Sequence, residues 1–539
     1  MQRSLGQVRK YFPFLLVLLL LSAAECIIYP VGDFALNDDF AYARSVYIWD
    51  KTGEFQIGGW PAMSLFSHSL LGLFFVKLFG FSYTVLRFSN MALCLITLFF
   101  IYRFFLKYQR PGISALVCVF IVFNPYYMNI FNSFMTDLTF FNYSFLAFYF
   151  LHNYYVHRKY KWLIPFFLFT VLSILARQFG VLLLFAFVAE SVIDFIRSRR
   201  AKQILISLSL LALGFFILFY FEKNVFHIQK GYNYQGIFVA GNELEVDTNI
   251  WRNIFEKTIL FLKFSGSLFI LFFVLNFTVL KQRMLNSHKI LFFIGVLIFV
   301  GSLFLVDHKE ITGHLVINFG LGIESTVDRL YIGTNVTHGS CNILFYGLIS
   351  LFFGGYILFA LWVSSKKINK DLSINPQKQF IIFLVTGYFL LLAIAETAFD
   401  RYCIFVAFFS VMYLMMGEIK VSKYSVIASL SITVLIGGFS VLATKDYFRA
   451  ARLKEKIRAD LIANYGVKDH ELNAGAEHVF WDRSVNEFNW VNWDHFNDKK
   501  YLVTRGPLQN FTVFKVYTYK RTMPPCIDTF YVLQKSPVK

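Results

Sequence analysis

The sequence has few charged residues for its length. Asp, Glu, Lys and Arg make up 16% of its 539 residues, whereas soluble globular proteins carry about 25%. The hydrophobic share of 57% and the mean hydropathy of +0.56 are also too high for a soluble fold, whose apolar share is roughly 45–50%. These values exclude an ordinary soluble protein and predict a chain that lies mostly in a membrane.

Acidic residues are scarcer than basic ones, 33 against 51, which leaves a formal net charge of +18. A nucleic-acid partner would require Lys and Arg gathered on one face of a folded domain. Here they stand in short groups between hydrophobic runs, as the positive-inside rule produces in membrane proteins. The charge therefore indicates orientation in a membrane, and we expect no nucleic-acid partner.

Cysteine is also rare and forms no CxxC pair. Its six positions lie mostly within or beside apolar runs: Cys26, Cys94, Cys118, Cys341, Cys403 and Cys526. They give no metal-ligand spacing and no clear disulfide framework. We therefore expect neither a metal ion nor another cofactor.

Long hydrophobic runs dominate the sequence. A transmembrane helix needs roughly 17–25 apolar residues, and the first such run, 11–28, follows a basic N-terminus and is predicted to be an uncleaved span. Further spans are predicted near 83–106, 112–130, 139–156, 162–176, 179–196, 203–221, 258–280, 290–306, 342–363, 380–396, 402–419 and 425–443. The sequence thus predicts a polytopic α-helical membrane protein with about thirteen spans.

The connections between these runs alternate in charge. Every second connection is basic, which places it in the cytoplasm with the N-terminus. The others are longer or mix acids with bases and are predicted to be exported: 29–82, 131–138, 222–257, 307–341 and 397–401. A single miscounted span would disturb this alternation downstream, so its persistence supports the predicted topology.

The exported regions have polar patterns of their own. In the first exported loop, 29–82, residues 38–49 are predicted to form an interfacial helix, and the interrupted apolar run 63–79 is predicted to form helices along the surface. We divide the chain into a transmembrane domain, 1–444, and a small exported α/β domain, 445–539. In the latter we expect a helix at 446–464 and strands at runs such as 512–517.

This topology gathers polar side chains at the exported membrane face. Three acids lie in the first two exported connections: Asp38, Asp39 and Asp137. Other polar residues stand at span ends on the same side: Arg87, Arg177, Gln178, Asp400 and Arg401. A carboxylate can take a proton from a hydroxyl group, and arginines can neutralise a phosphate. The combination suits the transfer of a group from a phosphate to a hydroxyl.

Each of these charged residues also has a purely structural explanation. Asp38 and Asp39 can be the N-cap and the first-turn acid of the interfacial helix, and Asp137 can cap the fourth span. The arginines can be interfacial residues that extend to the lipid headgroups. Their joint placement on one face favours the catalytic interpretation.

Several motifs resemble, in order and spacing, those of the GT-C superfamily of polyprenyl-phosphate-dependent glycosyltransferases. They are NDDFAYARSV with the downstream Gly53 and Trp60, GFSYTVLRFSN, FMTDLTF, ARQFG and FDRY. The chain is similar in particular to bacterial family-39-like proteins related to the aminoarabinose transferase of lipid A and to protein O-mannosyltransferases. The resemblance covers roughly 30–185 well and the rest by architecture, including an exported C-terminal domain.

The resemblance implies that the acid early in the first exported loop is catalytic. The spacing to Tyr42 points to Asp38, with Asp39 as the competing choice. Asp137 corresponds to a second acidic position, although Thr139 stands where the family has proline. The candidates for contacting the donor phosphate are Arg87, Arg177 and Arg401. The candidates for binding substrate are Tyr42, Gln178 and Asp400.

The sequence therefore predicts a membrane glycosyltransferase of a cell inner membrane or plasma membrane. It would move a sugar from a polyprenyl-phosphate donor to a hydroxyl of a lipid, glycan or protein acceptor at the exported face, with inversion and with Asp38 as general base. The alternative is a transporter or flippase of lipid-linked sugars, which would need polar residues near mid-span. The best candidates for that role are Glu190 and Asp194, which we expect to pair with Arg197 near the cytoplasmic end of their span.

Overall fold

The computed structural model describes residues 2–36, 38–57, 61, 63–199, 201–228, 375–394, 400–417, 421–475, 499–508, 511–523 and 525–535. The spans predicted at 258–280, 290–306 and 342–363 lie outside the described residues.

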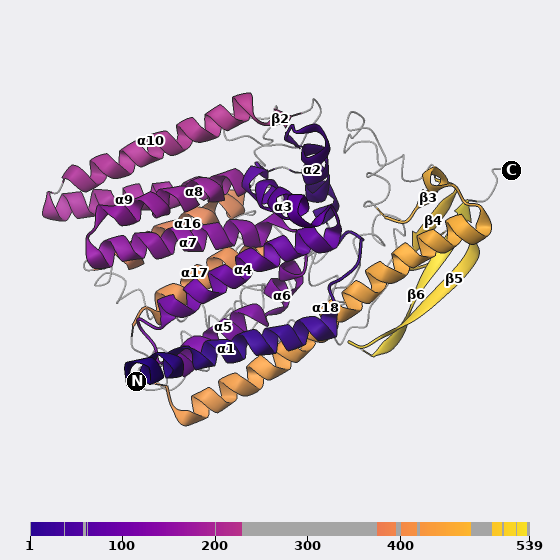
Figure 1. Cartoon of the computed structure of the whole chain (residues 1–539), viewed down its shortest axis with the longest axis horizontal. Helices are drawn as coiled ribbons and strands as arrows, with labels where there is room; N and C mark the ends of the chain where they lie inside the picture. The colour runs from indigo at the N-terminus through magenta and orange to yellow at the C-terminus, as the bar shows by residue number, and fades with distance from the viewer. Residues whose placement is uncertain are drawn as a thin grey trace, which may run out of the picture.

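A bundle of long helices makes up most of the described chain (Figure 1). Within the described ranges, five helices are long and apolar enough to cross a membrane, or up to six if a bent pair counts as one span. This confirms a multi-pass helical membrane protein; the predicted number of about thirteen spans stays a prediction. The bundle helices are α1 (Gln2–Ile28), α4 (Tyr83–Phe105), α7 (Thr136–His157), α8 (Leu163–Ala176), α9 (Leu182–Ser198), α10 (Ala201–Asn224), α16 (Pro376–Ile394), α17 (Cys403–Met415) and α18 (Lys423–Tyr465).

The span predicted at 112–130 is two helices, α5 (Pro111–Val122) and α6 (Pro125–Phe131), bent by 70°. The break comes from Pro125, which has no N–H to continue the helix and forces the preceding residue out of the helical region. Asn124 accordingly has extended dihedral angles, and its side chain caps α6 by accepting a hydrogen bond from the Tyr126 N–H at 3.1 Å. A run of sufficient length and hydropathy thus does not form one straight span.

The helix predicted at 446–464 is not separate from the last span. α18 runs without interruption for 43 residues and ends where Gly466 adopts a left-handed conformation. Because 444–446 contains neither Gly nor Pro, the backbone has no reason to break when the sequence changes from apolar to polar. The helix therefore projects beyond the bundle toward the C-terminal sheet (Figure 1).

The C-terminal sheet has four strands in the order β3-β4-β6-β5. β5 (Phe511–Arg521) and β6 (Cys526–Lys535) form an antiparallel hairpin with a bulge between Val513 and Lys515, and β4 (Tyr501–Thr504) pairs antiparallel with β6. β3 (Leu472–Asn473) runs parallel to β4. The sheet packs on the projecting part of α18 through a buried apolar cluster that includes Ile457, Leu461, Leu472 and Val532. The strand expected at 512–517 lies within β5.

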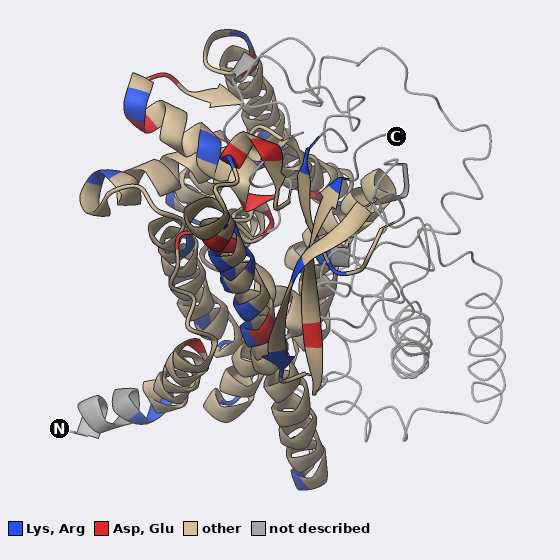
Figure 2. Ribbon diagram, turned by 90° about the vertical axis from the view of Figure 1, so that its right-hand side faces the viewer, with Lys and Arg blue, Asp and Glu red and all other residues tan. Residues whose placement is uncertain are grey.

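The first loop folds into two helices at the same end of the molecule as the sheet, and the N-terminus lies at the opposite end (Figure 1). They are α2 (Asp39–Thr52) and α3 (Phe66–Phe79), which packs against α2, α4 and α8. Between them, β1 (Gln56–Ile57) pairs with β2 (His227–Ile228). Figure 2 views this end face on and shows red and blue residues on the elements nearest the viewer, whereas the bundle helices are mostly tan.

Candidate active site

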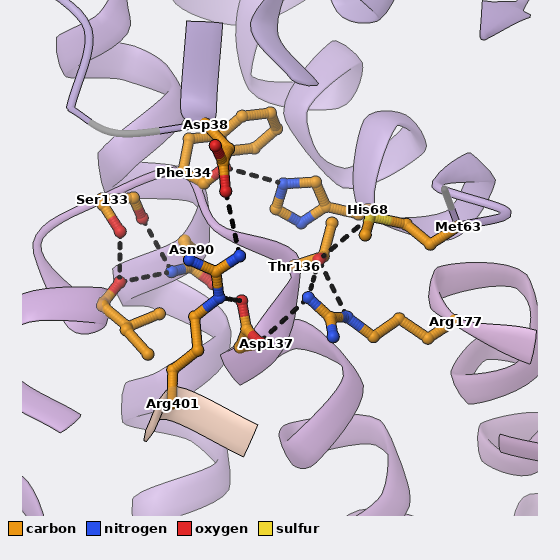
Figure 3. A network of polar contacts seen from close by, with 11 residues as sticks. Asp38, Met63, His68, Asn90, Ser133, Phe134, Thr136, Asp137, Arg177 and Arg401 are labelled. Carbon is orange, nitrogen blue, oxygen red and sulfur yellow. Dashed lines mark hydrogen bonds and ion pairs between the residues drawn. The ribbon is translucent and has the colours of Figure 1, made fainter. Parts of the chain in front are cut away.

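Four charged side chains form a chain of alternating sign that begins at Asp38, directly before α2 (Figure 3). Asp38 Oδ2 accepts a hydrogen bond from Arg401 Nη2 at 2.9 Å, and Arg401 Nε lies 3.5 Å from Asp137 Oδ2. The other oxygen of Asp137, Oδ1, lies 2.9 Å from Nη2 of Arg177. The structure thus brings together residues that the sequence separates by up to 363 positions.

The burial of this cluster explains why its charges are paired. The exposed fraction of the side chain is 3% for Arg401, 5% for Arg177 and 6% for Asp137, and 13% for Asp38. A charge that leaves water costs several kcal/mol unless it is paired, and here two carboxylates balance two guanidinium groups. Asp38 is the most accessible member of the cluster.

Local backbone structure aims each member of the cluster. Asp137 lies in the first turn of α7, and Arg177 has extended dihedral angles between α8 and the short helix η2 (Gln178–Val181). Thr136 Oγ1 accepts hydrogen bonds from Nε and Nη2 of Arg177 at 3.0 and 2.8 Å, and donates to Met63 Sδ at 3.6 Å. Arg401 comes from η4 (Asp400–Tyr402), directly before α17.

The geometry of Asp38 does not support its capping interpretation. Asp38 precedes α2, but it has helical dihedral angles and makes no side-chain capping hydrogen bond within the described part of the chain. Its carboxylate is instead directed at Arg401. Asp137 likewise forms ion pairs with arginines. Both acids therefore pair with the arginine cluster rather than cap a helix.

Asp39 faces different surroundings from its neighbour. Its side chain is fully buried, with Oδ1 accepting the Leu36 N–H at 2.6 Å and Oδ2 accepting the Phe134 N–H at 3.5 Å. Burial raises the pKa of the Asp39 carboxyl to about 7. Asp39 therefore connects the segment before α2 to the turn before α7, and of the two adjacent acids only Asp38 reaches the arginine cluster.

The predicted substrate-binding residues differ in their placement. Tyr42 is buried beside the cluster, where burial raises the pKa of its hydroxyl and the nearby Asp38 carboxylate raises that pKa further. Gln178 Oε1 accepts the Ser64 N–H at 3.3 Å and so braces the first loop. The side chain of Asp400 lies outside the described ones.

Arg87, predicted to bind the donor phosphate, has contacts that suggest another task. It is fully buried and its guanidinium donates to three backbone carbonyls of the segment that leads from α1 to α2, those of Pro30, Gly32 and Phe34. The guanidinium group also stacks over the Phe34 ring, with Cζ 4.7 Å from the ring centroid. We therefore leave Arg87 out of the phosphate site proposed below.

A pocket opens directly beside the arginine cluster. Its polar wall is formed by Asp137, Arg177 and Arg401. The remaining wall is aromatic and apolar, from α7, α16, η4 and α17: Phe140, Phe141, Tyr388, Tyr402, Ile404 and Phe405. The Tyr402 ring centroid lies 5.1 Å from Cζ of Arg177 and 5.6 Å from Cζ of Arg401. The pocket thus places two guanidinium groups and a carboxylate against an aromatic wall.

The sequence did not reveal several polar residues around this site, above all His68. The His68 ring stacks on Phe134 with centroids 3.9 Å apart, and its Nδ1 lies 2.8 Å from Thr139 Oγ1. Burial lowers the pKa of His68 to about 3, so the ring is neutral at physiological pH. The sequence did contain a signal for His68, because Ser67, His68 and Ser69 interrupt an apolar run. A helix that only lies on the surface does not require three polar residues at that point.

The described residues hold no group of three or more His, Cys, Asp or Glu side chains that could bind a metal ion.

The alternative site at Glu190 is also part of the described chain. Its carboxylate accepts hydrogen bonds from Tyr155 Oη at 2.6 Å and from Gln203 Nε2 at 2.8 Å. These two residues are its partners, whereas the sequence led us to expect Arg197. Glu190 therefore joins helices α7, α9 and α10.

Bundle and site together define a multi-pass membrane protein with a charged, aromatic-walled pocket at the end that carries the first loop. Residues 67–221 match the family model described as dolichyl-phosphate-mannose-protein mannosyltransferase. The match confirms over that segment the resemblance to the GT-C superfamily and supports a membrane glycosyltransferase.

The chain is also similar to the apo crystal structure of ArnT from Cupriavidus metallidurans, at 11% identity and a TM-score of 0.44, over 97% of this chain and 99% of that one. No curated protein matches the sequence.

Proposed function

We propose that this protein transfers a sugar from a polyprenyl-phosphate donor to an acceptor hydroxyl on the exported side of the membrane. The observation that carries the proposal is the Asp38–Arg401–Asp137–Arg177 chain of ion pairs, of which Asp137, Arg177 and Arg401 line an aromatic pocket. The matching family description names a dolichyl-phosphate sugar, which is a donor of this class.

Asp38 acts as the general base. Its carboxylate takes the proton of the acceptor hydroxyl while that oxygen bonds to the anomeric carbon of the donor sugar. The bond between this carbon and the phosphate oxygen breaks, and its electron pair leaves with the polyprenyl phosphate. Because this is a single displacement, the configuration at the anomeric carbon inverts.

Arg177 and Arg401 stabilise the phosphate as it leaves. Guanidinium groups hold phosphate oxygens through charge-assisted hydrogen bonds, and fixed donors aimed at developing charge lower the barrier most effectively in a dry site. Asp137 contacts both arginines and so fixes the distance between them. The aromatic wall then accommodates the first isoprene units of the donor.

The site lies at the end of the bundle opposite the N-terminus (Figure 1). Since the basic connections predict a cytoplasmic N-terminus, this end faces the exported side. Donor and acceptor would therefore meet at the outer membrane surface, in a cell inner membrane or plasma membrane.

The test is the substitution of the adjacent acids, Asp38→Asn and Asp39→Asn, in the full-length protein. Membrane vesicles with each variant receive radiolabelled polyprenyl-phosphate mannose, glucose or aminoarabinose, and the release of free polyprenyl phosphate is measured. General-base catalysis contributes about 10²–10⁴-fold, so D38N should lose at least about 100-fold in rate and D39N much less.

Equal protein levels and gel-filtration profiles serve as controls. A D38N variant that releases polyprenyl phosphate at the wild-type rate would refute Asp38 as the base. A wild-type protein that moves the intact lipid-linked sugar between leaflets and releases no polyprenyl phosphate would identify a flippase instead.

A further inference from the structure

The segment that connects α1 to Asp38 is held by two arginines from distant parts of the chain. Arg87 of α4 donates to the carbonyls of its second, fourth and sixth residues, Pro30, Gly32 and Phe34. Arg452, on the part of α18 that projects beyond the bundle, donates to the carbonyls of the first and third, Tyr29 and Val31. The carbonyls thus alternate between the two arginines, and neither arginine alone holds the whole segment.

Aromatic stacking reinforces this arrangement. The Phe34 ring centroid lies 4.7 Å from Cζ of Arg87 and 5.7 Å from Cζ of Arg452. Phe448, one turn before Arg452 on α18, contributes a second ring at 5.3 and 5.5 Å from the same two atoms. The two rings meet edge to face, with centroids 5.9 Å apart. Cation–π contacts of this kind are strongest where water is excluded.

The backbone at Gly32 is adapted to this packing. Gly32 has φ +146°, and a Cβ there would collide with the Phe34 ring, so only glycine allows the ring to fold back toward the arginines. The Gly32 N–H also donates to Thr84 Oγ1 at 2.9 Å, and Asp33 Oδ1 accepts the Tyr83 N–H at 2.9 Å. The segment is therefore fixed along the start of α4, five and six residues before Asp38.

The same stretch of α18 is fixed to the C-terminal sheet. Arg449, three residues before Arg452, donates to Thr522 Oγ1 at 2.9 Å, and Asp446 accepts the N–H groups of Thr522 and Met523, both at 2.7 Å. The sheet thus holds the projecting helix, and the helix holds the segment before Asp38. This is a continuous physical connection between the sheet and the site.

We propose that Arg452 is a positioning residue for Asp38. The carbonyls of Tyr29 and Val31 lie outside regular secondary structure, and Arg452 supplies donors to both from a helix that the sheet keeps in place. The proposal relies on the proposed function only for naming Asp38 as the base. Its structural part is independent of that function.

The structural part is tested by hydrogen exchange of the full-length protein in detergent. Loss of hydrogen bonds to a charged group should raise the amide exchange rates of 29–41 about tenfold in Arg452→Ala, with 136–157 unchanged. Arg458→Ala is the matched control, because Arg458 lies on the same projecting part of α18 but bonds to Asp469 and should leave 29–41 protected. Unchanged exchange in R452A, or an equal rise in R458A, would overturn the proposal.

The catalytic part is tested by kinetics in the same vesicles, with the labelled polyprenyl-phosphate sugar that the wild type uses. R452A should lower kcat about tenfold with the donor KM within about threefold, since a misplaced base affects the reaction more than donor binding. Arg452→Lys, which keeps the charge and one donor group, should recover part of kcat. A raised KM with unchanged kcat would place Arg452 in donor binding and overturn the positioning role.

Full activity of D38N would reject the proposed function, and the exchange data would still decide whether Arg452 holds the segment.

Discussion

At the scale of single residues, two adjacent carboxylates have opposite surroundings. Asp38 pairs with an arginine at a pocket and stays partly accessible, whereas Asp39 is fully enclosed and accepts two backbone N–H groups. Adjacent residues at the start of a helix point in different directions. Asp38 therefore reaches the arginine cluster, whereas Asp39 binds the backbone of the first loop and of the turn before α7. The proposed division of roles follows from this difference.

Asp39 should make stability depend on pH. Its folded-state pKa of about 7 lies above its ordinary value, so the folded protein binds the proton more tightly than the unfolded chain. This contribution is complete below pH about 4 and is lost as pH rises to about 7. The melting temperature of the wild type should therefore fall relative to that of Asp39→Asn between pH 5 and pH 8. A difference that stays constant with pH would show that Asp39 is ionised in the folded protein.

Thr136 should matter for binding the donor. Its hydroxyl accepts two hydrogen bonds from Arg177, and hydrogen bonds to a charged group contribute about 1.5–3 kcal/mol. Thr136→Val keeps the shape but frees the guanidinium group, so the KM for a polyprenyl-phosphate sugar should rise about tenfold or more. Thr170→Val is the matched control, because Thr170 bonds only to the Phe166 carbonyl of its own helix in the described structure. An unchanged KM in T136V would remove Arg177 from the phosphate site.

At the scale of elements, the sequence located helices better than it located their breaks and partners. Length and hydropathy predicted the spans around α4, α9 and α10 because burial in lipid requires long apolar runs. They did not predict the bend at Pro125 or the continuation of α18 into the polar tail, because those depend on backbone hydrogen bonding at single positions. The bounds of α2 and α3 were close to those expected.

Only part of the site could be predicted, because the remaining contacts depend on which residues the fold brings together. Acids and arginines at span ends identify a face of the membrane, so Asp38, Asp137, Arg177 and Arg401 could be grouped from the predicted topology. The task of Arg87 could not be found, because its partners are backbone carbonyls, which every residue type carries. His68 and Tyr388 were missed because a buried polar or aromatic residue in an apolar run looks like ordinary core until its neighbours are known.

The packing of α18 against α5 and α6 can be tested with two adjacent glycines. A Cβ at Gly437 would lie 3.2 Å from the Phe123 Cβ, whereas nothing lies within 4 Å of one at Gly438. Gly437→Leu should destabilise the protein by about 1–3 kcal/mol through overpacking, and Gly438→Leu should not. Thermal unfolding in detergent compares the two. Equal melting temperatures would mean that α18 does not lie against the bend as described.

At the scale of the whole molecule, α18 joins two environments. Its first half lies in the bundle, and its second half carries the sheet and contacts the segment before Asp38. A soluble domain that was merely tethered would have no such contacts. The sheet is therefore connected through α18 to the segment before Asp38.

The orientation of the molecule can be tested at Cys526. This cysteine is free and exposed on β6, at the end predicted to be exported. A membrane-impermeant maleimide added to intact cells should label the wild type more strongly than Cys526→Ser. In the C526S background, Arg199→Cys, between α9 and α10, should react only after permeabilisation. Labelling of R199C alone in intact cells would reverse the topology and place the site in the cytoplasm.

The central claim is that one pocket presents two arginines to a lipid phosphate beside Asp38. The most direct measurement is a structure of the full-length protein with polyprenyl phosphate bound. We expect the phosphate oxygens within hydrogen-bonding distance of Arg177 and Arg401, with the prenyl chain against Phe140 and Phe405. A polyprenyl phosphate bound elsewhere, with the ion pairs of Asp38 and Asp137 unchanged, would contradict the proposed sugar transfer.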